Sequence, residues 1–175
     1  MTRVAVNTFT FSAGSKSLSI DNAVLGRVPK RLLFTMVKNA DFMGTNDTNP
    51  YKFRRYDISD FSLLVNGKQY PNEVLSLGMD HVKTSLMVSR TLFEGSGIHH
   101  SNAGHQITHG YFMLLFDLTL DQGASEAQTS HPEQGNIRVD LKYAKPLPEM
   151  FTCLIYLEID SAVLINSARN VTTDY

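Results

Sequence analysis

The segment 135–160, GNIRVDLKYAKPLPEMFTCLIYLEID, decides the fold class, because it contains two strand patterns in succession. In the first pattern, every second residue is apolar: Ile137, Val139, Leu141 and Tyr143. In the second, one of the two alternating faces is entirely apolar: Phe151, Cys153, Ile155, Leu157 and Ile159. A period of two is the spacing of side chains on one face of a β-strand. We therefore predict two strands, each with one face in a hydrophobic core.

The same period recurs through the rest of the chain. Residues 4–11 and 16–20 alternate and are joined by the turn-forming residues SAGS, which predicts two further strands. Residues 31–37 and 111–120 are apolar at both alternating positions. Strands of this kind are typically covered on both faces, so we expect cover on both sides of this part of the sheet.

Local signals predict one hairpin and one helix. The stretch FSLLVNGKQYP contains Asn66-Gly67, and this pair accepts the positive φ angles of a type I′ hairpin turn. Apolar residues at helical spacing predict a helix over about 80–94, with Asp80 as its N-cap and Gly95 as its stop. We expect the apolar stripe of this helix to pack on the core.

These elements predict an all-β fold. The expected architecture is a jelly-roll sandwich of two four-stranded antiparallel sheets with one short helix at about 80–94. The 175 residues fit a single domain, 1–175, and the strand pattern alone does not separate a jelly roll from other β-sandwiches.

Composition argues against several classes of protein. The formal net charge is −1 and the isoelectric point is about 6.6, which disfavours binding to nucleic acid or to an anionic membrane through bulk charge. The longest apolar run, Phe112–Phe116, is far too short to cross a bilayer. The N-terminal residues alternate and have no continuous apolar stretch, so we expect no signal peptide and no secretion. Cys153 is the only cysteine, and we interpret it as a buried, unreactive thiol.

Four of the six histidines lie close together: His99, His100, His105 and His109. Clustered histidines raise the hypothesis of a metal site. However, HQITH lacks the glutamate of the metalloprotease helix motif, and glycines on both sides disfavour a helix there. We interpret the four as residues of a polar loop that leads into the strand after it, with a pH-sensitive contact or metal binding as the alternatives.

The stretch YKFRRYD, residues 51–57, interleaves basic and aromatic side chains. Such a pattern can stack on and pair with single-stranded nucleic acid. Because the net charge is near zero, we favour a different interpretation of this stretch. It would be a loop or the edge of a strand, with its cations in solvent above a buried aromatic ring, or it would form a contact between subunits. No specific nucleic-acid site is predicted.

The motifs of several enzyme classes are missing from the sequence. There is no Gly-x-Ser-x-Gly nucleophile elbow, no phosphate-binding loop and no dinucleotide-binding fingerprint. We therefore expect no catalytic residues, no cofactor, no metal and no small-molecule substrate, and a protein that is not an enzyme.

Six stretches in order resemble one known family: LGRVPKRLLFTMV (25–37), NPYKFRRYDIS (49–59), LLVNGKQYP (63–71), GYFMLLFDLT (110–119), GNIRVDLKYAKPLP (135–148) and ARNVTTDY (168–175). Together they resemble the major capsid protein of Polinton (Maverick) elements and the related adintoviruses, the hexon-like protein of virus-like DNA transposons. The resemblance runs from about Phe9 to Tyr175 and corresponds to the C-terminal part of that protein.

The resemblance implies a structural role. Proteins of this family contain two jelly rolls in tandem, and three copies form a capsomer of an icosahedral shell around double-stranded DNA. This chain would be the second, C-terminal jelly roll. Its partners would be further copies and other capsid proteins, and it would be located in the virion and, before assembly, inside the host cell.

Two other functions stay open at this level. A penton-like minor capsid protein of such a virus is itself a single jelly roll. A carbohydrate-binding or other ligand-binding jelly roll is the non-viral alternative, and the absence of tryptophan counts against sugar binding, because sugar faces stack best on large aromatic rings.

Overall fold

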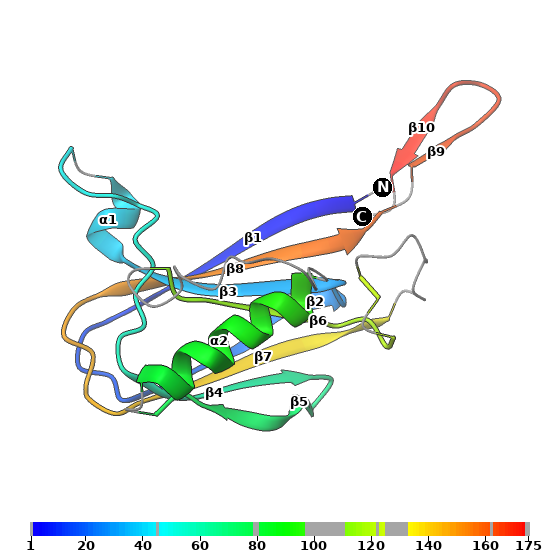
Figure 1. The fold of residues 1–175 in the computed structure, drawn as a ribbon. Coiled ribbons are helices and arrows are strands. Elements are labelled where there is room, and N and C mark those ends of the chain that lie inside the picture. Colours follow the sequence, from blue (N-terminus) through cyan, green and yellow to red (C-terminus); the bar gives the residue numbers. More distant parts are fainter. Residues whose placement is uncertain are drawn as a thin grey trace.

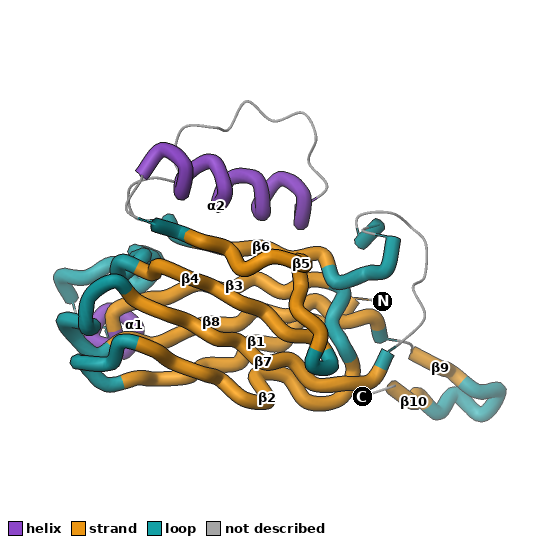
Figure 2. The backbone as a smooth tube through the Cα atoms, turned by 90° about the horizontal axis from the view of Figure 1, so that it is seen from below, coloured by secondary structure: helices purple, strands orange, loops and turns teal. Residues whose placement is uncertain are grey.

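In the computed structural model, two four-stranded antiparallel sheets pack face to face (Figures 1 and 2). The structure describes residues 2–44, 46–78, 81–96, 111–121, 123–124, 133–161 and 163–173. The first sheet has the spatial order β1 (Thr2–Phe11), β8 (Phe151–Asp160), β3 (Arg31–Lys38) and β6 (Met113–Asp117). The second has the order β2 (Ser17–Arg27), β7 (Gln134–Tyr143), β4 (Ile58–Val65) and β5 (Lys68–Ser76).

This strand order is that of a jelly roll. Strands that follow one another along the chain mostly lie in opposite sheets, and the two segments of the opening stretch form the inner strands β7 and β8. Eight strands in two four-stranded sheets with such crossovers define the double Greek key of the jelly roll. The predicted all-β jelly-roll sandwich is therefore confirmed.

The core lies between the sheets and is dominated by aromatic contacts. Phe61 of β4 lies between Phe34 of β3 and Phe116 of β6, with ring centroids 5.0 and 5.5 Å away. Phe34 and Phe61 are fully buried and Phe116 nearly so. Because Phe61 belongs to one sheet and the other two rings to the opposite sheet, this group holds the sheets together.

The predicted hairpin is confirmed. Strands β4 and β5 pair in antiparallel register from Val65 and Lys68 outward. Asn66 and Gly67 both have positive φ angles, 51° and 76°, as a type I′ turn requires.

The predicted helix is confirmed with a later end. Helix α2 spans His81–Ser96, so Gly95 lies inside it and does not stop it, while the proposed N-cap Asp80 lies outside the described residues. The helix packs along β6, at the edge of the first sheet (Figure 2). A Cβ atom at Gly95 would lie 2.7 Å from the carbonyl oxygen of Leu115, so glycine permits the close approach of helix and strand.

Three other elements differ from the expectation. A short helix, α1 (Asn39–Met43), follows β3 and was not predicted. Strand β6 occupies only the middle of the predicted 111–120 strand, since Asp117 turns the chain by accepting hydrogen bonds from the backbone and hydroxyl of Thr119. A third, two-stranded sheet, which was not predicted, pairs β9 (Val163–Ile165) with β10 (Val171–Thr173).

Replacing Phe61 by alanine tests the aromatic core. Because the side chain is fully buried between the sheets, we expect the free energy of unfolding in urea to fall by about 3–5 kcal/mol. The control is Val74→Ala, 44% exposed on the edge strand β5, which we expect to change it by about 0.5 kcal/mol or less. A loss below about 1 kcal/mol for Phe61→Ala would contradict this packing.

The Cys153 thiol provides a probe of global unfolding. Cys153 is fully buried on β8, and burial raises its pKa far above the ordinary value, so the reactive thiolate is suppressed in the folded protein. We expect a thiol reagent at pH 8 to label Cys153 only as fast as the protein unfolds, and rapidly in denaturant. Fast labelling of the native protein would show that β8 is accessible.

Candidate interaction surface

The outer face of the first sheet carries a continuous row of apolar side chains. The strand register places Val6 of β1 beside Tyr156 of β8, Tyr156 beside Leu33 of β3, and Leu33 beside Leu115 of β6. These residues alternate with the core residues of the same strands, so they point away from the sandwich. The sheet is therefore apolar on both faces along this row.

Among the residues that the structure describes, α1 and α2 cover the margins of this face. At one end, α1 packs on β3 and β8, where Val37 and Thr152 are fully buried and Thr152 donates a hydrogen bond to Asn39. On the β6 side, α2 covers Leu115.

Between these two covers, five apolar side chains keep exposed surface. They are named here the apolar outer face: Val4, Val6, Leu33, Leu154 and Tyr156. Val4 is 49% exposed and Val6 54% exposed. Side chains exposed singly are common in soluble proteins, but a row of them across neighbouring strands is typical of an interaction site.

The outer face of the second sheet has the opposite character. Its strands turn mostly polar and charged side chains outward: Ser17, Ser19, Asp60, Ser62, Arg138, Asp140 and Lys142. Two leucines lie among them, Leu64 and Leu25, the latter 77% exposed. Arg138 forms ion pairs with Asp140 at 3.0 Å and with Asp21 at 3.3 Å. The register also places Lys142 beside Asp60. This polar outer face is suited to water, so the two sides of the sandwich differ strongly in chemistry.

The basic and aromatic stretch 51–57 anchors the loop after α1 to the end of the sandwich. Arg54 forms an ion pair with Glu149 at 3.3 Å and lies 3.9 Å from the buried carboxylate of Asp41. Lys38 also contacts Glu149, at 2.8 Å. Arg54 is therefore engaged with carboxylates of its own chain, which is a structural role.

The aromatic residues of this stretch are also used internally. The ring of Tyr56 lies 5.4 Å from that of Phe151, and its hydroxyl donates a hydrogen bond to Glu149. Burial and the negative charge of Glu149 raise the pKa of Tyr56 above its usual range. Phe53 forms a parallel bridge with Tyr111, and only Tyr51 projects largely into solvent, 68% exposed.

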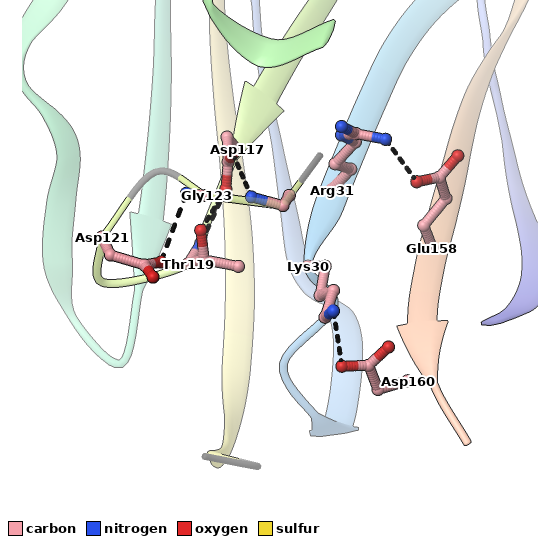
Figure 3. Close-up of polar contacts among 9 residues, drawn as sticks. Lys30, Arg31, Asp117, Thr119, Asp121, Gly123, Glu158 and Asp160 are labelled. Atoms are coloured by element: carbon pink, nitrogen blue, oxygen red, sulfur yellow. Dashed lines mark hydrogen bonds and ion pairs between the residues drawn. The ribbon is translucent and has the colours of Figure 1, made fainter. Parts of the chain in front are cut away.

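The opposite end of the sandwich is held by a second set of polar contacts (Figure 3). Lys30 binds Asp160 at 2.8 Å and Arg31 binds Glu158 at 3.1 Å, so two ion pairs join β8 to the start of β3 and the residue before it. Asp117 accepts hydrogen bonds from Thr119 and from the backbone of Ala124 and fixes the turn after β6.

A pocket of about 430 Å³ opens at this end. This end pocket is lined by Arg27, Val28, Pro29, Lys30, Leu118, Thr119, Leu120, Glu133, Gln134 and Asp160. Its walls come from the connection between β2 and β3, the turn after β6, and the ends of β7 and β8. Next to it, a backbone hydrogen bond from Gly123 lowers the pKa of Asp121.

The other residues proposed from the sequence do not form a site in the described structure. His99, His100, His105 and His109 lie outside the described residues. Cys153 is in the core. Within the part of the chain that the structure describes, no three His, Cys, Asp or Glu side chains are grouped to hold a metal ion, and no helix has the length and hydropathy to cross a membrane.

Sequence reasoning missed the apolar outer face as a surface of its own. It did predict that the strand over 31–37 is covered on both sides. The signal for the rest was present, since Val4 and Val6 alternate with the inward-facing Ala5, and Leu154 and Tyr156 alternate with the core residues of β8.

Comparisons with known proteins agree with the fold. No protein-family model matches the chain. An uncharacterized protein of Caenorhabditis elegans, F54H12.2, is 21% identical over 176 aligned residues, which cover 97% of this chain and 42% of that protein. A chain in the cryo-EM structure of the Sputnik virophage superposes with a TM-score of 0.55 at 12% sequence identity, over 99% of this chain and 38% of that chain. The chain thus shares the fold of a virophage chain and spans less than half the length of either relative.

Replacing Arg54 by methionine tests the anchoring role of stretch 51–57. The buried Asp41 would lose its nearby cation, and Glu149 one of its two, so we expect the free energy of unfolding to fall by about 1–2 kcal/mol, measured in urea. The matched control is Arg55→Met, because Arg55 makes one long hydrogen bond, 3.4 Å to the carbonyl of Gly78. Equal effects of the two variants would show that the ion pairs of Arg54 do not matter.

Proposed function

We propose that this chain is one jelly-roll unit of a viral major capsid protein and that it associates with other capsid subunits through the apolar outer face. The observation that carries the proposal is the contrast between the two outer faces of the sandwich. One has an apolar middle that the described residues leave partly uncovered, with the Arg31–Glu158 ion pair at its end, and the other carries ion pairs among its outward side chains. Such an apolar patch is typical of a protein–protein contact, and a shell subunit contacts its neighbours.

The shared fold supports the viral part of the proposal. A jelly roll in two four-stranded sheets is also the fold of a Sputnik virophage chain. Six ordered stretches resemble the major capsid proteins of Polinton elements and adintoviruses, and on this resemblance we propose a more specific role. In it, the chain is the C-terminal jelly roll of a double jelly-roll protein, three copies of which build a capsomer of an icosahedral shell enclosing double-stranded DNA.

The role we propose is structural, without enzyme activity, and located in the virion. The described contacts support a structural role, since the most concentrated charges, around Arg54 and Glu149, connect parts of the same chain. The lengths of the relatives favour a major capsid protein over a penton-like protein with a single jelly roll. Both relatives extend to more than twice the matched region, which leaves room for a second domain.

Association through the apolar outer face is tested with a charge placed in it. Val6 is 54% exposed on an edge strand, so Val6→Glu leaves the core intact but puts a carboxylate beside Tyr156. We expect the wild-type chain to form oligomers as its concentration rises, and Val6→Glu to weaken this association at least about tenfold, because burying an unpaired charge is costly. Light scattering and sedimentation give the masses.

The matched control introduces a glutamate on the polar outer face instead. Ser17 is exposed on the edge strand β2, beside Lys142, so Ser17→Glu adds the same charge without loss of packing. We expect it to associate like the wild type. Wild-type protein that stays monomeric at all concentrations, or equal weakening by both variants, would refute the proposed interface.

A further inference from the structure

Strands β9 and β10 form a hairpin arm that extends beyond the sandwich. Figures 1 and 2 both show this arm, residues 163–173, pointing away from the two main sheets at the end where β8 finishes. Its register pairs Ile165 with Val171 and Val163 with Thr173. At the tip, Asn166 accepts a hydrogen bond from the backbone of Arg169 and another, through its side chain, from the backbone of Asn170. The arm therefore has a definite shape.

No described part of the chain buries the arm. Every side chain from 163 to 172 is exposed. Paired residues in an antiparallel hairpin point to the same side, so Val163, Ile165 and Val171 share one face, with exposed fractions of 39%, 69% and 62%. Leu164 points to the other face. A lone two-stranded hairpin is marginally stable in water, so an apolar arm of this kind needs a surface to pack on.

The end pocket lies at the same end of the molecule and has suitable chemistry. Part of its wall is apolar: Val28, Pro29, Leu118 and Leu120. Leu120 is 95% exposed and offers apolar surface to a partner. The charges of the lining cancel, two basic against two acidic residues, and Asp160 and Glu133 already bind Lys30 and Asn66. This balance favours an uncharged, apolar occupant over a small ion.

The pocket is also held in shape before any partner arrives. The backbone of Lys30 donates to the carbonyl of Glu158 at 2.7 Å, and that of Leu118 donates to the carbonyl of Lys30 at 2.8 Å. A receptor and a ligand that are both ordered in advance lose little conformational freedom on binding.

We propose that the arm of one copy docks in the end pocket of a second copy, with Val163, Ile165 and Val171 against its apolar wall. This inference rests on the proposed function, because in a shell the neighbours of a subunit are other subunits. Arm and pocket are different patches, so the contact is heterologous. Repetition of a heterologous contact gives a ring where the rotation between successive copies closes, and an open chain where it does not.

Crosslinking of two single-cysteine variants tests the contact. Chains with Ile165→Cys are mixed with chains with Leu120→Cys under mild oxidation, at a concentration where the wild type associates. The buried Cys153 does not compete. We expect a disulfide dimer that contains one chain of each variant. The control pairs Leu164→Cys, on the opposite face of the arm, with Leu120→Cys, and we expect the yield of its mixed dimer to be at least about tenfold lower. A mixed dimer no more abundant than in the control, or a dominant dimer between two Ile165→Cys chains, would overturn the proposal.

A second variant separates this inference from the proposed function. Ile165→Glu alters an exposed side chain, so the fold is retained, and we expect association to weaken at least about tenfold in sedimentation. If Ile165→Glu associates like the wild type while Val6→Glu does not, the arm contact is wrong and the interface of the apolar outer face stands. If Val6→Glu also has no effect, the proposed function fails.

Discussion

The structure depends on β8, an inner strand with apolar side chains on both faces. It pairs with β1 on one side and with β3 on the other over nearly its whole length. Its inward residues form the centre of the core, and its outward residues Leu154 and Tyr156 must also be covered if their apolar surface is to leave water. The short helix α1 and the long helix α2 cover the two margins of this face, and in the proposed function a second subunit covers the part between them.

The ion pairs of the first sheet are concentrated at its two ends. At one end, Glu149 pairs with Lys38 and Arg54 and so holds the loop after α1. At the other end, Lys30 pairs with Asp160 beside the end pocket. The middle of the first sheet is left to apolar contacts. Such a distribution gives rigid ends, from which an arm can project in a fixed direction, and a broad apolar side for association.

Much of the fold could be predicted from the sequence, because its signals are local. The alternation in 137–143 marked β7, and Asn66-Gly67 marked the hairpin. Helix α1 escaped prediction since its five residues are too few for a period and Lys38 before it makes no side-chain cap. The arm was missed because its exposed faces have no core to impose a pattern. The apolar outer face could not be located before the register was known, since only pairing places Val6, Tyr156 and Leu33 in one row.

The central claim is that the apolar outer face, and not the polar one, is buried when subunits meet. Hydroxyl-radical footprinting at rising protein concentration measures this directly, because it reports the solvent exposure of individual side chains. Tyr156 and Leu154 report on the apolar outer face, and the partly exposed Leu64 of β4, beside Arg138 on the opposite side, is the internal reference. We expect the oxidation of Tyr156 and Leu154 to fall as the chain associates while that of Leu64 stays constant. Protection of Leu64 with unchanged oxidation of Tyr156 would contradict the claim.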